Sequence, residues 1–155
     1  MMDSTVVFLD IDGALCPYDT DWRRSGLPAL STRYDYKRIT PLQVPIAAHV
    51  EDFVRSLTPE NAVWSSSWGD ISIAINESLG TDNFQHTMTN ELLIQGKEYC
   101  LEVFLKDHPE IQRVILVEDE PYEVNADVDV VYVSTHRFTG MTVEQVEFVS
   151  SLLTQ

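Results

Sequence analysis

The sequence is poor in basic residues and has no long apolar runs. The first shortage argues against extended binding to nucleic acid, and the second argues against a membrane-spanning segment. Its 155 residues include 10 Lys and Arg against 25 Asp and Glu, giving a formal net charge of −15 at pH 7. Such a negative field repels polyanions, so we expect no extended binding to nucleic acid; a local pocket for a phosphate or a nucleic-acid end stays open. No stretch approaches transmembrane length and no secretory leader is visible, so we expect no membrane association.

Cysteine is also scarce. The two cysteines, Cys16 and Cys100, match neither a metal-ligand spacing nor a disulfide framework. We therefore expect free thiols and a soluble protein in the reducing cytoplasm. The length and the 44% hydrophobic content favour a single folded domain over residues 1–155. Nothing in the sequence indicates an oligomeric state.

Short apolar runs alternate with amphipathic segments along the chain. Buried strands are predicted at 5–10, 61–66, 114–117 and 128–133, and helices at 43–57, 69–79, 97–108 and 142–153. Thr142 and Gln145 form a capping-box pattern at the start of the last helix. The alternation predicts an α/β fold, a three-layer Rossmann-like parallel sheet with helices on both faces. Ligands bind such sheets beyond the carboxyl ends of the strands, so the polar residues that follow each strand are the candidates for a site.

Two acidic pairs follow predicted strands. Asp10 and Asp12 lie two positions apart after the first strand, so on an extended backbone their side chains can point the same way. Glu118 and Asp119 follow the third strand. Carboxylates crowded at one sheet edge repel each other unless a cation lies between them, and Mg²⁺ prefers oxygen ligands. Taken together, the pairs favour metal binding over solvated acidic turns.

A hydroxyl and a lysine occur between these acidic pairs. Ser65 and Ser66 follow the second strand, where a hydroxyl can bind a phosphate oxygen or cap the next helix. Lys97 begins a helix, a place that the helix dipole does not favour for a cation. Neutralising a phosphate would explain it, but an exposed lysine is the simpler alternative. We expect Trp64 and Trp68 to be packing residues.

These elements occur in an order that resembles the four motifs of the haloacid dehalogenase (HAD) superfamily. The segment Val-Phe-Leu-Asp-Ile-Asp-Gly-Ala-Leu at 7–15 is similar to the first motif, and Val117 to Glu120 resembles the Glu-Asp form of the fourth. The Trp-x-Ser-x-Trp pattern at 64–68 and Gly140 to Thr142 resemble a compact branch without a folded cap. Members of that branch occur beside bacterial and phage RNA-repair enzymes. The resemblance spans nearly the whole chain.

The resemblance implies a magnesium-dependent phosphatase that works through an aspartyl-phosphate. Asp10 would be the nucleophile and Asp12 the general acid and base. Mg²⁺ would be held by Asp10, the Asp12 main-chain carbonyl and Asp119, with Glu118 nearby. Ser66 aligns best with the phosphate-binding hydroxyl, with Ser65 as a competitor. Lys97 would bind phosphate, and Lys106 is a poorer match.

Residues 14–42 are expected to form a flap over the site, because the gap between the first two motifs is too short for a folded cap. This segment carries half of the basic residues of the chain: Arg23, Arg24, Arg33, Lys37 and Arg38. They would recognise substrate anions, unless the segment is only a solvated loop. The expected substrate is a phosphorylated small molecule or a nucleic-acid end. The alternatives are a catalytically idle domain that senses phosphate and an acidic mimic of nucleic acid.

Overall fold

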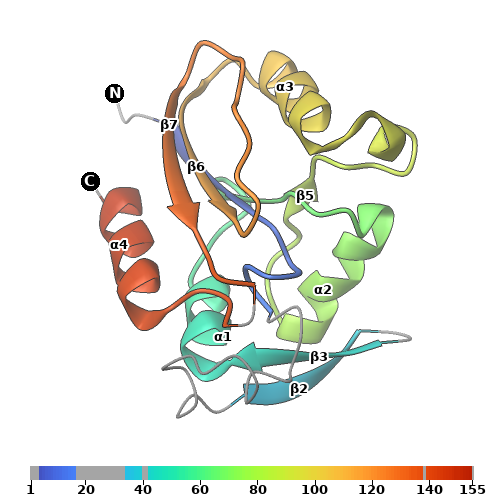
Figure 1. Ribbon diagram of the computed structural model, residues 1–155, viewed down its shortest axis with the longest axis vertical. Coiled ribbons are helices and arrows are strands. Elements are labelled where there is room, and N and C mark those ends of the chain that lie inside the picture. Colours follow the sequence, from blue (N-terminus) through green and yellow to red (C-terminus); the bar gives the residue numbers. More distant parts are fainter. Residues whose placement is uncertain (1–3, 17–33, 40–41, 138, 155) are drawn as a thin grey trace.

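Five parallel strands form the central sheet of the molecule (Figure 1). The computed structural model describes residues 4–16, 34–39, 42–137 and 139–154. In the sheet the strand order is β5-β4-β1-β6-β7, so that β1, which carries the first acidic pair, lies in the middle. The strands are β1 (Ser4–Leu9), β4 (Ala62–Trp64), β5 (Gln85–His86), β6 (Ile111–Glu118) and β7 (Asp129–Ser134).

Helices cover both faces of this sheet, which confirms the predicted three-layer α/β fold. Side chains of β1 alternate between two separate clusters of buried residues, as expected for a strand covered on both sides. Val7 and Leu9 pack with α1 (Ala48–Arg55), α2 (Ser72–Leu79) and α4 (Val143–Leu153). Val6 and Phe8 pack against α3 (Lys97–Asp107) on the opposite face. Two short 3₁₀ turns, η3 (Gly69–Ile71) and η4 (Leu93–Gln95), precede α2 and α3.

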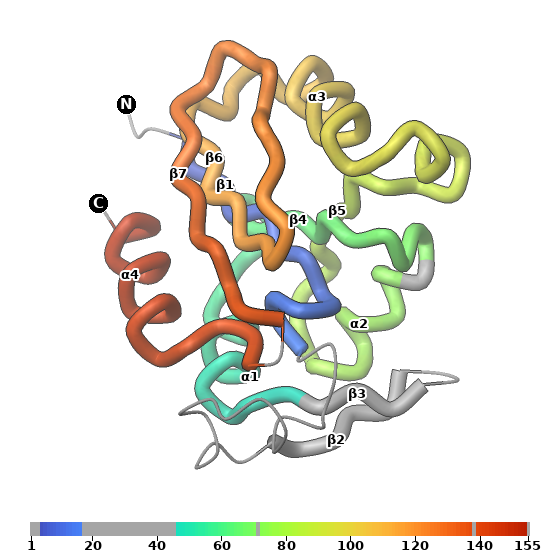
Figure 2. Tube along the Cα trace, in the orientation of Figure 1, coloured from blue at the N-terminus to red at the C-terminus, as the bar shows by residue number. Residues whose placement is uncertain are grey.

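The carboxyl ends of the central strands meet at one edge of the sheet (Figure 2). The strand β1 is in parallel register with β4 on one side and β6 on the other, with Leu9 opposite Trp64 and Val117. Consequently Asp10, Ser65 and Glu118, which follow or end these strands, lie in one region. The strand β7 extends the sheet beside β6, with Ser134 opposite Glu118.

The prediction of a helix from residue 43 is wrong for its first part. Residues Leu42–Ala47 form strand β3, which pairs antiparallel with β2 (Tyr34–Ile39), and α1 begins only at Ala48. Pairing with β2 accounts for the difference, because the apolar spacing of this segment fits a strand as well as a helix. The hairpin lies beside α2, at the end of the molecule toward which β6 and β7 run (Figure 1).

Most of the expected flap falls outside the described residues. Arg23, Arg24 and Arg33 belong to that part, as do the side chains of Lys37 and Arg38 in β2. The hypothesis that they contact substrate anions therefore stays a prediction. Both cysteines are free and buried. No helix in the part of the chain that the structure describes is long and apolar enough to cross a bilayer.

Candidate active site

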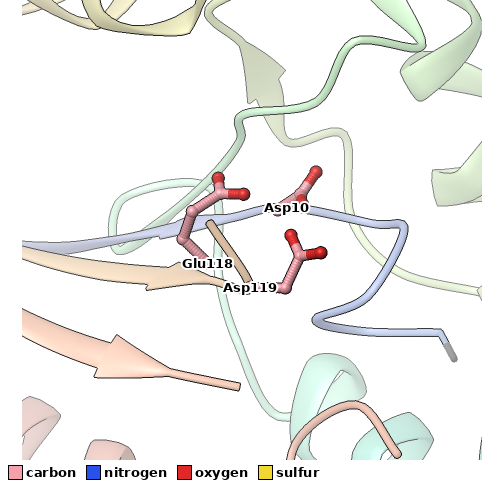
Figure 3. Close-up of side chains that lie close together, drawn as sticks. All are labelled: Asp10, Glu118 and Asp119. Carbon is pink, nitrogen blue, oxygen red and sulfur yellow. The ribbon is translucent and has the colours of Figure 1, made fainter. Parts of the chain in front are cut away.

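Three buried or half-buried carboxylates converge where β1 and β6 end (Figure 3). Asp10 follows β1 directly, and its amide donates to the Val117 carbonyl of the neighbouring strand at 3.2 Å. Glu118 ends β6 and Asp119 begins the loop after it. One oxygen from each of the three side chains lies within 4.8 Å of the others, so they could surround a single ion.

Lys97 is a cation in direct contact with this cluster. Its Nζ lies 3.0 Å from Asp10 Oδ1 and 2.9 Å from Glu118 Oε1, so it bridges the ends of β1 and β6 from the first turn of α3. Burial disfavours its charge, but the two carboxylates outweigh burial and raise the pKa of Lys97. Lys106 lies instead at the other end of α3, exposed and beside a different cavity.

The two buried carboxylates are not fully neutralised by Lys97. Burial raises the pKa of Asp10, and the Lys97 ammonium offsets this only in part. Burial also raises the pKa of Glu118, and the adjacent Asp10 raises it further. Only 3% of Asp10 and 1% of Glu118 are exposed, so without another cation the pair favours sharing a proton.

A turn after β1 makes room for the third carboxylate. Gly13 has φ of +82°, and a Cβ atom there would lie only 2.4 Å from Asp119 Oδ2. The turn is held by the Gly13 amide, which donates to Cys16 at 2.7 Å, and by the Thr135 hydroxyl, which donates to the Gly13 carbonyl at 2.7 Å. A glycine is therefore needed both for the backbone conformation and for the approach of Asp119.

The donor set fits a hard divalent cation. All three candidate side-chain ligands are carboxylate oxygens, the cluster carries more negative charge than Lys97 balances, and Gly13 leaves space for Asp119. The side chain of Asp12 is not part of this group, and the family resemblance implies only its main-chain carbonyl as a metal ligand.

The acids and Lys97 line an open cavity of about 520 Å³. Among the described residues, its lining consists almost entirely of charged or hydroxyl side chains: Asp10, Asp12, Ser67, Lys97, Glu118, Asp119, Glu120, Tyr122 and Arg137. Such a lining suits a small polar anion together with a cation, rather than an apolar ligand.

The three serines after β4 differ in their surroundings. Ser65 Oγ is buried and lies close to the Tyr122 hydroxyl. Ser66 Oγ accepts from the Trp68 amide at 3.2 Å, so it caps the turn that leads into α2. Neither Ser65 nor Ser66 lines the cavity, whereas the exposed Ser67 does. The choice between Ser65 and Ser66 therefore stays a prediction, and Ser67 has the hydroxyl that lines the cavity.

Trp68, Tyr122 and Arg137 lie at or beside the site, like Ser67, without having been predicted as site residues. Trp68 packs against the core as expected, but its indole Nε1 also donates to Asp12 Oδ2 at 2.7 Å. Arg137 follows β7, and a polar residue after a strand end is a signal that the sequence contains. Tyr122 has a buried hydroxyl close to that of Ser65, and burial raises the pKa of this phenol. A lone tyrosine in a loop gave no signal in the sequence.

Comparison with known protein families agrees with this geometry. Residues 6–146 match the family described as "HAD domain in Swiss Army Knife RNA repair proteins". The chain belongs to this HAD family. Neither the curated proteins nor the solved structures contain a match. Membership confirms the superfamily and the branch that the motifs indicated, and HAD membership implies a hydrolase.

Proposed function

We propose that this HAD domain is a magnesium-dependent phosphatase that removes terminal phosphate monoesters from RNA ends through an aspartyl-phosphate on Asp10. The observation that carries the proposal is the position of the Asp10 carboxylate. It lies 3.0 Å from the Lys97 ammonium, within 4.8 Å of two further acids, in a cavity lined by charged groups. The family description supports an RNA end as the substrate class.

In the first step, an Asp10 carboxylate oxygen attacks phosphorus. The new Asp10–phosphorus bond forms while the bond to the leaving oxygen breaks, and Asp12 gives its proton to that oxygen. In the second step, water attacks the phosphorus and gives a proton to Asp12. The bond to Asp10 breaks, so inorganic phosphate leaves and both carboxyl groups return to their starting states.

Lys97 can bind the phosphoryl group by exchanging one of its two contacts with Glu118. Its Nζ lies within hydrogen-bond distance of Asp10 Oδ1 and of both Glu118 carboxylate oxygens, so a phosphoryl oxygen would replace one Glu118 oxygen while the other contacts remain. Asp10, Asp119 and Glu118 would hold Mg²⁺. The hydroxyl of Ser65 or Ser66 would donate a hydrogen bond to the phosphoryl group. When bound, Mg²⁺ neutralises charge on the phosphoryl oxygens during transfer.

The negative charge of the protein favours recognition of a terminal phosphate of RNA over binding along a long stretch of its backbone. A net charge of −15 repels a polynucleotide backbone, whereas one terminal phosphate can enter a local site that contains Lys97 and a divalent cation. Arg137, exposed at the edge of the cavity, is suited to contact a neighbouring phosphate.

The test is turnover with Mg²⁺ on para-nitrophenyl phosphate and on RNA oligonucleotides that carry a 3′ or a 5′ phosphate. Asp10→Asn should abolish release of phosphate. Asp107→Asn is the matched control, because it makes the same change at an exposed residue at the end of α3 that does not line the cavity. Full activity in Asp10→Asn would refute the proposal. No turnover by a folded, magnesium-binding wild type would instead favour a phosphate sensor.

A further inference from the structure

Among the described residues, Trp68 forms a short hydrogen bond with the side chain of Asp12. The indole Nε1 donates to Asp12 Oδ2 at 2.7 Å, across 56 residues of sequence. Among the described residues, Asp12 Oδ1 has no such partner, and Asp12 lines the cavity that contains Asp10. One carboxylate oxygen is therefore engaged by the protein and the other is available.

The Trp68 indole is itself held firmly. Its ring packs against the core cluster beneath the sheet, and its backbone amide donates to Ser66 Oγ. The next residue, Gly69, has φ of +63°, and a Cβ there would lie 2.5 Å from the Asn90 side chain. Asn90 and Asp70 are joined by two backbone-to-side-chain hydrogen bonds that link η3 to the loop after β5. The indole N–H is thus aimed by packing and by loop contacts on both sides.

An indole N–H has a specific effect on a carboxyl group. It can donate but not accept, so Asp12 Oδ2 cannot carry a proton directed at Trp68. The carbonyl oxygen of a carboxyl group is the better acceptor, so the contact of Oδ2 with Trp68 favours placing a proton of Asp12 on Oδ1. A general acid contributes only when its proton lies within hydrogen-bond reach of the leaving oxygen.

We infer that Trp68 is a positioning residue for general acid catalysis, which holds Asp12 so that Oδ1 faces the leaving oxygen of the substrate. The inference rests on the proposed phosphatase function and adds a role that the motif pattern does not contain. In the first step, the Oδ1 proton moves to the leaving oxygen as its bond to phosphorus breaks. The Trp68 N–H keeps its hydrogen, and its bond to Oδ2 stabilises the carboxylate that results.

The test compares substrates that differ in their need for a proton. A para-nitrophenolate leaves without protonation, whereas the hydroxyl of a nucleoside or an alkyl group needs a proton. Trp68→Phe keeps an aromatic ring but removes the N–H. We expect kcat/KM to fall about tenfold or more for a nucleoside monophosphate and to change little for para-nitrophenyl phosphate. The value of kcat/KM reports the steps up to and including transfer of the phosphoryl group to Asp10. The later hydrolysis of the aspartyl-phosphate therefore does not affect it.

Trp64→Phe is the matched control. It removes another indole N–H bond, from Trp64 to Asn76 at 3.0 Å, but from a fully buried ring that does not line the cavity. Trp64→Phe should lower stability and leave the ratio between the two substrates unchanged. An equal loss on both substrates in Trp68→Phe, or no loss on either, would overturn the inference.

A spectroscopic measurement covers the case in which Trp68→Phe does not fold. The chain has three tryptophans, so three indole N–H signals are expected from protein labelled with ¹⁵N. Trp22→Phe and Trp64→Phe assign them by elimination. Asp12→Asn should shift the Trp68 signal and leave the Trp64 signal in place; an unmoved Trp68 signal would overturn the inference. Inactive wild-type protein with a responsive Trp68 signal would refute the phosphatase proposal but not the contact.

Discussion

At the scale of single residues, Gly13 links the backbone of the first motif to the acid of the fourth. Its φ of +82° lies in a region that other residues enter only at a cost. The carboxylate of Asp119 occupies the space that a side chain at position 13 would fill. The approach of Asp119 to Asp10 therefore depends on the absence of one methyl group.

Gly13→Ala should displace Asp119 and weaken magnesium binding. We expect a loss of about tenfold or more in kcat/KM, since small displacements of positioned groups have effects of this size. The measurement combines turnover with the magnesium-dependent rise in melting temperature. Gly80→Ala is the control, because Gly80 also has a positive φ (+66°) but no atom within 4 Å of the added Cβ. Equal loss of magnesium response in both variants would contradict this reading.

The residues of the site were predictable to different degrees. Asp10, Glu118 and Asp119 could be located because parallel strands bring polar residues at their ends to one edge. The contact of Trp68 with Asp12 could not, because it depends on the rotation of a side chain after a turn. Tyr122 illustrates the same limit, since its position depends on how the loop after β6 packs.

At the scale of elements, the start of α4 supports the turn that carries the first motif. The Met141 amide donates to the Ala14 carbonyl at 2.7 Å, and the Met141 carbonyl contacts His49 Nε2 of α1 at 2.8 Å. Thr142 then caps α4, with Gln145 completing the reciprocal pair of hydrogen bonds. The helix cap and the active-site turn are thus adjacent in the structure.

Thr142→Ala should destabilise the protein by about 1 kcal/mol, the usual effect of losing an N-cap hydroxyl. For a chain of this length that corresponds to a fall of roughly 2–4 °C in melting temperature. Ser151→Ala removes a hydroxyl from the exposed face of the same helix and should change stability by less than about 0.5 kcal/mol. The measurement is the melting temperature of each variant, compared with that of the wild type. Similar losses in the two would show that the cap has no special role.

Elements with their own local signals were predicted well. The apolar runs located β1, β4, β6 and β7, and the capping box located the start of α4. The segment 43–47 was wrongly assigned to a helix because its apolar spacing fits both periods, and pairing with β2 decided between them. The strand β5 has only two residues, too few for a periodic pattern, and it depends on pairing with β4.

At the scale of the whole molecule, the buried acids couple folding to pH. Folded protein without metal holds, on the pair of Asp10 and Glu118, a shared proton that the unfolded chain would release, because folding raises the pKa of each. Their contribution to stability is complete below the ordinary carboxyl pKa of about 4 and is lost as pH rises toward the folded values. The raised pKa of Lys97 adds a constant contribution over this range, since the ammonium stays charged in both states.

Without magnesium, the melting temperature should therefore fall between about pH 5 and about pH 8, and added Mg²⁺ should reverse the fall. Binding of the cation replaces the shared proton, so the gain from magnesium should grow with pH. Glu118→Gln should flatten the dependence, because it removes the group with the larger shift. A metal-free stability that rises over this interval, in wild type and variant alike, would show that the acids are not buried together as described.

The net charge of −15 affects how fast the protein associates with an anionic substrate and how that rate depends on salt. Salt screens repulsion between the acidic surface and an oligonucleotide, with a Debye length of about 10 Å at 0.1 M. We expect kcat/KM for an RNA with a terminal phosphate to rise or stay level from about 20 to about 200 mM salt, relative to para-nitrophenyl phosphate. Proteins that bind the phosphate backbone show a steep fall instead. Such a fall here would mean that a local basic surface, and not the net charge, governs the encounter. The five basic residues of the segment 14–42 would then be the first to neutralise.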